Sequence, residues 1–240
     1  MFFPDLAMGL HDARSILEIG PSIAPHPCAT AWLDRRFASD VEQKEQRCSP
    51  ESRSLDFEKK ITYYDGGVFP FSDAQFDYIL CSHVLEHISK DELPQFVSEM
   101  FRVGKSGYVE IPHIGYEITC NVEPHLWFIS FNEDGLLFYY KQDFAPTDNE
   151  KLLLALLGNW TRFIHFGAPE KNPMFFYGFE WEKQFSFQVV SQFSDLFSEY
   201  FFATITAECN RLEKLQNISY VKKFVQKAKD KINLIRKYGV

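Results

Sequence analysis

The stretch from Ile61 to Pro112 constrains the fold more than any other part of the chain. Its runs Ile61–Tyr64, Phe76–Cys81 and Tyr108–Ile111 are rich in the β-branched and aromatic residues that favour strands. Segment 91–103, between the last two runs, carries apolar residues three and four positions apart, which is typical of an amphipathic helix. This order of elements predicts an α/β fold: a Rossmann-like, mostly parallel sheet with flanking helices and right-handed crossovers.

Two more strand-like runs precede this stretch. Ser15–Ile19 ends at Gly20, and Ala29–Leu33 ends at Asp34. We expect Ser15–Ile19 to be the first and central strand. Ligands of such sheets bind beyond the carboxyl ends of the strands, so functional residues are expected at these ends and around Ser82.

Two segments of this region resemble a known family. FPFSDAQFDYILCSHVLEHI (69–88) and RVGKSGYVEIP (102–112) are similar, in the same order, to motifs of class I S-adenosylmethionine-dependent methyltransferases of type 11. The resemblance covers roughly Ser15 to Pro112. It implies S-adenosyl-L-methionine as cofactor and a small-molecule or glycan-like methyl acceptor.

The family places a glycine-rich turn after the first strand, and this chain departs from that pattern. Gly20 to Pro27 contains one glycine and three prolines, with Ser22 at the place of a second glycine. The prolines make a long regular helix unfavourable here. The resemblance implies that Glu18, Gly20 and Ser22 meet the cofactor; the alternative is an ordinary proline-rich loop.

Two acids follow the next strands. The resemblance implies that Asp34 binds the ribose hydroxyls, whereas the alternative is a plain acid at the strand end or an ion pair with Arg35 or Arg36. It also implies that Asp65 binds the adenine amino group, with Gly66 keeping the backbone open. An Asp-Gly pair also favours turns without any ligand.

The segment Ser82–His87 allows two interpretations. The resemblance puts Ser82 and His83 beside the sulfonium. Alternatively, HVLEH fits the H-x-x-E-H pattern of a zinc hydrolase, because His83 and His87 would share a face of a helix. The sequence identifies no third ligand, so we expect no metal.

The second half of the chain is aromatic. Pro124 to Phe202 contains 22 of the 40 aromatic residues, which suggests a lid or a substrate wall as well as core packing. A turn at Asn132–Gly135 predicts a hairpin, and Met174–Val190 contains a second pair of strand-like runs.

Histidine is suited to proton transfer near neutral pH. The candidates for a catalytic base are His83, His113 and His125. His125 and Trp127 precede the hairpin and are, with His113, candidates for the pocket wall.

Composition narrows the classes further. The net charge of −8 disfavours a general nucleic-acid binder, and five scattered cysteines without a CxxC pair fit a reducing, cytoplasmic location. We see no signal peptide and no apolar run of about 20 residues. Polar segment 37–58 is expected to be a surface excursion.

Segment 211–237 has nine basic and two acidic residues around an apolar stripe at helical spacing. This helix either packs on the body or a second copy, or contacts a membrane surface or partner. We therefore divide the chain into a Rossmann-like cofactor-binding core (1–112), an aromatic-rich lid or substrate region completing the sheet (113–208) and a basic amphipathic helix (209–240).

A methyltransferase is the function that the sequence favours. The alternative is a non-catalytic binding or scaffold protein on the same fold, since fold alone does not establish activity. The departures of the Gly20–Pro27 turn motivate that alternative.

Overall fold

The computed structural model describes residues 7–23, 25–46, 53–145, 147–148, 151, 175–201, 203–204 and 207. Its strands are β1 (Ile16–Ile19), β2 (Ala31–Arg35), β3 (Thr62–Tyr64), β4 (Phe76–Ser82), β5 (Gly104–Pro112), β6 (Trp127–Phe131), β7 (Gly135–Tyr140), β8 (Phe176–Glu182) and β9 (Ser186–Val189). Its α-helices are α1 (Asp40–Gln46), α2 (Leu55–Glu58), α3 (Leu93–Val103) and α4 (Ile114–Cys120). Short 3-10 turns are η2 (Met8–His11), η3 (Leu85–His87), η4 (Lys141–Asp143) and η6 (Phe193–Leu196).

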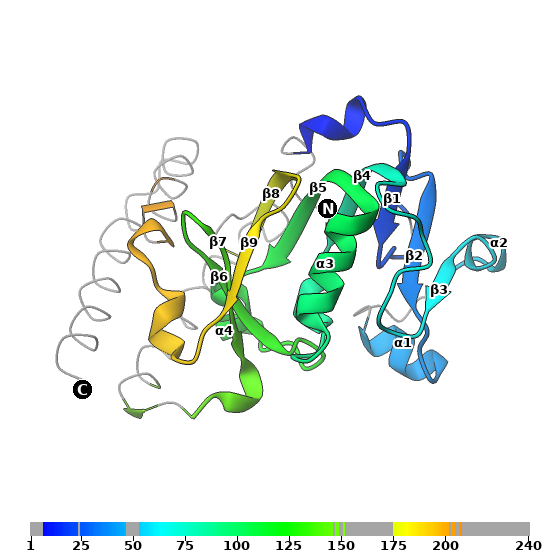
Figure 1. The fold of residues 1–240 in the computed structure, drawn as a ribbon. Helices are drawn as coiled ribbons and strands as arrows, with labels where there is room; N and C mark the ends of the chain where they lie inside the picture. Colours follow the sequence, from blue (N-terminus) through cyan, green and yellow to red (C-terminus); the bar gives the residue numbers. More distant parts are fainter. Residues whose placement is uncertain are drawn as a thin grey trace, which may run out of the picture.

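The main sheet is Rossmann-like, as predicted. Its order is β3-β2-β1-β4-β5-β8, and the first five strands are parallel (Figure 1). β1 is central: Ile19 lies opposite Leu33 of β2 and Cys81 of β4. In the described residues, β1 reaches β2 through a loop without a helix, in agreement with the prolines of this segment. The carboxyl ends of three adjacent strands therefore meet at one edge of the sheet.

Helix α3 packs on the sheet in front of β4 and β5 (Figure 1). Its apolar side chains Phe96, Val97, Met100 and Val103 are buried in the main core cluster together with sheet residues such as Ile79. The spacing read from the sequence therefore identified both this helix and its buried face.

The predicted hairpin is formed by β6 and β7, which pair antiparallel. The two later runs also form strands, but the expectation that they pair with each other is wrong. β8 adds to the main sheet antiparallel to β5, whereas β9 pairs parallel with β7 in a second, three-stranded sheet. The reason is that β8 covers the open edge of β5, while β9 extends the hairpin.

Segment 37–58 is more structured than the expected surface excursion. It contains α1 and α2, and it places Arg53 in the interior with 7% of its surface exposed. Within the described ranges, no helix combines the length and the apolar character needed to cross a bilayer. The predicted C-terminal helix over 209–240 lies outside the described residues.

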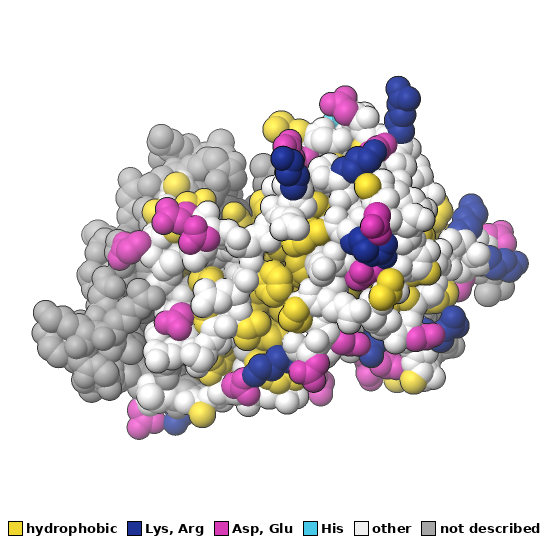
Figure 2. All heavy atoms as spheres, in the orientation of Figure 1, with side chains coloured by type: hydrophobic (Ala, Val, Ile, Leu, Met, Phe, Trp, Pro, Cys, Tyr) yellow, Lys and Arg dark blue, Asp and Glu magenta, His cyan; other side chains and the backbone are white. Residues whose placement is uncertain are grey.

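A strip of apolar surface runs between α3 and β9 (Figure 2). Phe101 of α3 and Phe185, in the turn before β9, are partly buried against the main core cluster, and their ring centroids are 5.0 Å apart. Much of the aromatic content of this half of the chain thus serves core packing, which was one of the two roles expected from the sequence.

The contact between β5 and its neighbours can be tested at Gly107. A Cβ atom here would lie 2.5 Å from the carbonyl oxygen of Ile79 and 2.8 Å from the Trp181 ring. We expect Gly107→Ala to lower the free energy of unfolding by about 1–3 kcal/mol, as measured by urea denaturation. Glu182→Ala, at the exposed end of β8, is the control and should change it by less than about 0.5 kcal/mol. Equal stability of the two variants would contradict the tight β4–β5–β8 packing.

Candidate active site

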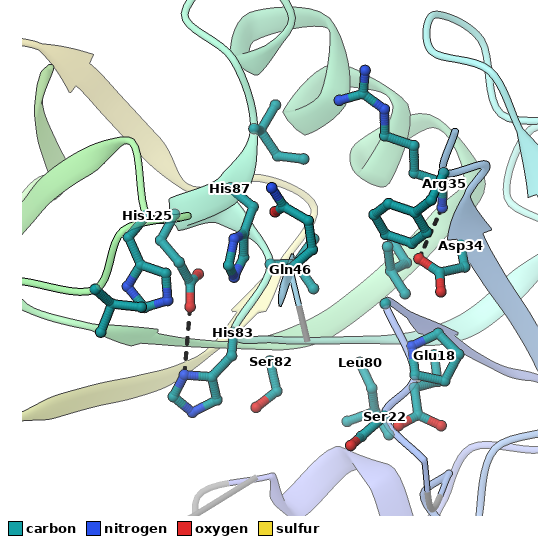
Figure 3. Close-up of a pocket in the computed structure, with 18 of the residues that line it drawn as sticks. Glu18, Ser22, Asp34, Arg35, Gln46, Leu80, Ser82, His83, His87 and His125 are labelled. Atoms are coloured by element: carbon teal, nitrogen blue, oxygen red, sulfur yellow. Dashed lines mark hydrogen bonds and ion pairs between the residues drawn. The ribbon is translucent and has the colours of Figure 1, made fainter. Parts of the chain in front are cut away.

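One pocket opens at the carboxyl ends of β1, β2 and β4, with a volume of about 520 Å³. That volume lies within the range of small-molecule sites. Figure 3 shows Glu18, Ser22 and Asp34 on one side and His83, His87 and His125 on the other. The pocket is therefore wide enough to present two chemically different walls to its contents.

The structure brings most of the predicted site residues to this pocket. Its lining includes Glu18, Gly20, Ser22, Asp34, Ser82, His83 and His125. Asp65, Gly66 and His113 do not line it. Asp65 follows β3, two strands away from β1, and points to solvent, where its carboxylate pairs with Arg36 at 3.1 Å.

Two other residues that were predicted to line the pocket make contacts that stabilise the fold. The Nδ1 atom of His113 accepts a hydrogen bond from the Gly115 N–H at 3.0 Å and caps α4. Trp127 is fully buried, and its Nε1–H donates to the Ile88 carbonyl at 2.6 Å. Both residues therefore serve the packing of the second sheet against the core.

Gly20 is a backbone requirement of the turn. Its φ angle is +64°, and a Cβ atom would lie 2.6 Å from the Cγ2 atom of Val84. Its N–H donates to the Leu33 carbonyl at 2.8 Å. The left-handed conformation and the contact with Val84 both exclude a larger side chain at this point of the pocket.

Glu18 is a pocket acid at the end of β1. Its Oε2 atom accepts a hydrogen bond from the His26 N–H at 2.9 Å, so it holds the proline-rich loop. Burial raises the pKa of this carboxyl above its usual value, although the hydrogen bond from His26 acts in the opposite direction. A cation beside Glu18 would offset the cost of burying its charge.

Asp34 is bound by an arginine that the sequence did not indicate. Its Oδ2 atom lies 2.6 Å from Nη2 of Arg53, and its Oδ1 atom accepts from the Arg35 N–H at 2.8 Å. Of the two arginines predicted as alternative partners, Arg36 pairs with Asp65, and Nη1 of Arg35 lies 3.7 Å from Oε2 of Glu92. Arg53 also donates to the carbonyls of Pro21 and Ser22. It thus ties the glycine turn to β2.

A second buried network surrounds Glu110 of β5. Its Oε1 atom accepts from Ser82 Oγ at 3.0 Å and lies 3.1 Å from His83 Nε2, and its Oε2 atom accepts from the Tyr108 hydroxyl at 2.7 Å. Burial raises the pKa of Glu110, but the hydrogen bonds from His83 and Tyr108 more than offset this and lower it to about 2. Glu110 is therefore ionised at neutral pH.

His83 is held in an unusual position by this network. Its φ angle is +57°, and its side chain is 27% exposed to the pocket. Burial lowers the pKa of His83, but the hydrogen bond with Glu110 and the nearby charges of Glu110 and Glu86 outweigh this and raise it above the usual value.

The second wall contains Glu86, His87 and His125. Glu86 and His87 belong to η3, a single 3-10 turn that His83 precedes, so the shared helical face predicted for His83 and His87 is wrong. His125 comes from the loop before β6, and its ring centroid lies 4.6 Å from that of His87. The sequence indicated no further metal ligand near Glu86 and His87, whereas the fold brings His125 next to them.

Sequence reasoning missed Arg53 and Glu110. Arg53 lies in a polar segment with no local pattern that distinguishes it from its neighbours. Glu110 could have been noticed, because an acid between Val109 and Ile111 in a buried strand needs a partner.

A family model described as a methyltransferase domain matches residues 30–109, a third of the chain. Over this segment the chain is similar to methyltransferase domains, in agreement with the resemblance drawn from its motifs. The segment supplies β2, β3, β4 and most of β5, and it contributes Asp34, Ser82 and His83 to the pocket. No match was found among curated proteins.

Solved structures similar to this chain include the YcgJ protein from Bacillus subtilis, with 21% identity over 44% of this chain and 49% of that one and a TM-score of 0.30. A putative methyltransferase from Bacillus halodurans is 14% identical over 48% and 56%, with a TM-score of 0.31. The N-terminal domain of EvdMO1, crystallised in the presence of SAH and D-fucose, is 18% identical over 45% and 48%, with a TM-score of 0.29. In each case the match spans about half of the solved chain, and similarity this low assigns no activity.

The link between Glu110 and His83 predicts a measurable pKa change. Glu110→Gln removes the charge and weakens the hydrogen bond that favour the imidazolium, so we expect the pKa of His83 to fall. Titration of the histidine Cε1–H signals by NMR measures this. The signal of His26, which contacts Glu18 and not Glu110, is the internal control. An unchanged His83 pKa would contradict the coupling.

Proposed function

We propose that this protein is an S-adenosylmethionine-dependent methyltransferase that acts on a small-molecule or glycan-like acceptor in the cytoplasm. The observation that carries the proposal is that one pocket is lined by Glu18, Asp34 and Ser82 from three adjacent parallel strands, two of which lie in the segment similar to methyltransferase domains. The carboxyl ends of such strands are where this class of sheet binds nucleotides.

The pocket fits such a cofactor in size and charge. Gly20 leaves the turn free of a side chain, so backbone groups of Gly20 and Ser22 would hold the methionine end. Asp34 would accept hydrogen bonds from the ribose hydroxyls. When bound, the cofactor supplies a methyl group on a positively charged sulfur. Glu18, Glu86 and Glu110 carry negative charge around this region and would favour that sulfonium.

The carboxylate of Asp34 would bind both Arg53 and the ribose. One oxygen of Asp34 accepts from Nη2 of Arg53, and the other accepts from the Arg35 N–H. The Arg53 guanidinium also fixes the carbonyls of Pro21 and Ser22, so it holds the turn and the ribose-binding acid in one arrangement. This connection offsets the lack of a helix after the turn.

Catalysis of methyl transfer is mainly positioning, and a base is needed only where the acceptor loses a proton. His83 is bound to Glu110, whose hydrogen bond raises the pKa of His83, and this suits orientation of its neighbours. His113 lies outside the pocket. His125 and His83 both line the pocket on the wall opposite Asp34.

The acceptor would approach along the wall formed by Tyr116 and Phe176. Both rings line the pocket and stand 5.0 Å apart between centroids. Aromatic faces next to polar histidines suit a compact acceptor with both apolar and hydroxyl groups, such as a sugar ring.

A binding or scaffold protein is the second candidate. The specific observation in its favour is the buried pair between Asp34 and Arg53, because it occupies the group that a ribose would need. Titration calorimetry with S-adenosylmethionine and with S-adenosylhomocysteine separates the two. No heat at millimolar ligand would leave only the binding role.

A matched pair of variants tests where the cofactor binds. Asp34→Asn removes a charged acceptor inside the pocket, and we expect it to weaken S-adenosylhomocysteine binding about tenfold. Asp65→Asn changes an equivalent acid outside the pocket and should leave the affinity unchanged. Circular dichroism and thermal unfolding confirm that both variants fold. A larger loss at Asp65 than at Asp34 would overturn this location.

A further inference from the structure

We propose that Glu86, His87 and His125 form a binding site for a divalent first-row transition metal ion, such as Zn²⁺ or Mn²⁺. Each residue offers one ligand atom, and these atoms lie within 4.8 Å of one another. Ligands bound to one ion at about 2.1 Å are separated by at most about 4 Å, so small side-chain rotations complete the set. The three residues come from two segments, η3 and the loop before β6.

Glu86 is the first reason to infer an ion here. Its side chain is fully buried, and neither carboxylate oxygen accepts a hydrogen bond among the described residues. The Nδ1 atom of His83 lies 3.5 Å from Oε1 of Glu86. Burying a carboxylate without hydrogen bonds is costly, and such groups are typically paired or bound to a metal.

The orientation of His87 is the second reason. Its Nδ1 atom lies 3.2 Å from the carbonyl oxygen of Pro124, which can only accept, so Nδ1 carries the proton. The Nε2 atom of this neutral ring then has the lone pair that a metal requires.

His125 has the same arrangement with a stronger partner. Its Nδ1 atom bonds to Oε1 of Glu117, whose other oxygen bonds to Nζ of Lys141. Lys141 holds Glu117 as an acceptor, and Glu117 fixes the His125 tautomer. A metal-binding histidine typically donates its other ring N–H to a carboxylate or a carbonyl, as both rings do here.

Two imidazoles and one carboxylate suit zinc or another borderline divalent ion and leave coordination positions open. All three residues line the pocket, so those positions face its contents. A bound ion would hold an acceptor hydroxyl and lower its pKa, which would replace a protein base. This consequence, though not the metal site itself, rests on the proposed function and favours oxygen as the methylated atom.

The test uses the full chain after treatment with EDTA and dialysis. We expect one equivalent of Zn²⁺ or Mn²⁺ to bind, as measured by titration calorimetry and elemental analysis. His125→Ala and the isosteric Glu86→Gln should each weaken binding at least tenfold. His26→Ala, which removes a histidine from the same pocket but not from the cluster, should bind as the wild type does.

Two results would overturn the site: no stoichiometric binding by the wild type, or unchanged binding by both His125→Ala and Glu86→Gln, which would indicate an adventitious ion. Should a variant fail to fold, X-ray absorption of the Zn²⁺-loaded wild type decides between two imidazole ligands and other sets. S-adenosylhomocysteine titration of the same preparation is independent. Metal binding without cofactor binding would overturn the proposed function alone.

Discussion

The pairing of β1 with β2 on one side and β4 on the other is the constraint on which the site depends. Ile19 lies opposite Leu33 and Cys81, so the three strands end at one level and place Gly20, Asp34 and Ser82 beside one another. Parallel strands buried on both faces are held by apolar side chains, and β1 is almost fully buried. The rigid sheet therefore fixes the floor of the pocket, while loops supply its walls.

The pocket is unusual in its number of acids that are removed from water. Asp34, Glu86 and Glu110 are all buried, and the free-energy cost of burying the charge is offset by different partners in each case. Asp34 has a guanidinium, and Glu110 has three hydrogen-bond donors. Among the described residues, Glu86 has an ion-pair contact with His83 and the imidazoles of His87 and His125 beside it. This difference distinguishes the pocket wall with Asp34, which is proposed to bind the cofactor, from the wall with Glu86, which is proposed to bind a metal ion.

Much of the local structure could be predicted from the sequence. The strands at Ile16–Ile19 and Phe76–Ser82, helix α3 and the β6–β7 hairpin follow from residue spacing and turn chemistry, which act over a few neighbours. The partners of β8 and β9 could not be predicted in this way. Both strands have similar aromatic composition, and which sheet edge each one covers depends on the edges left open by the rest of the fold.

The chain by itself determined which residues stand at the ends of strands: Gly20, Asp34, Asp65 and Ser82 were all identified from local patterns. Only the tertiary structure decided which of them share a pocket. Asp65 is excluded because β3 lies at the edge of the sheet, and Arg53 and His125 are brought in by contacts across 19 and 8 residues to Asp34 and Glu117. Such contacts depend on strand order and side-chain direction, which no short stretch of sequence encodes.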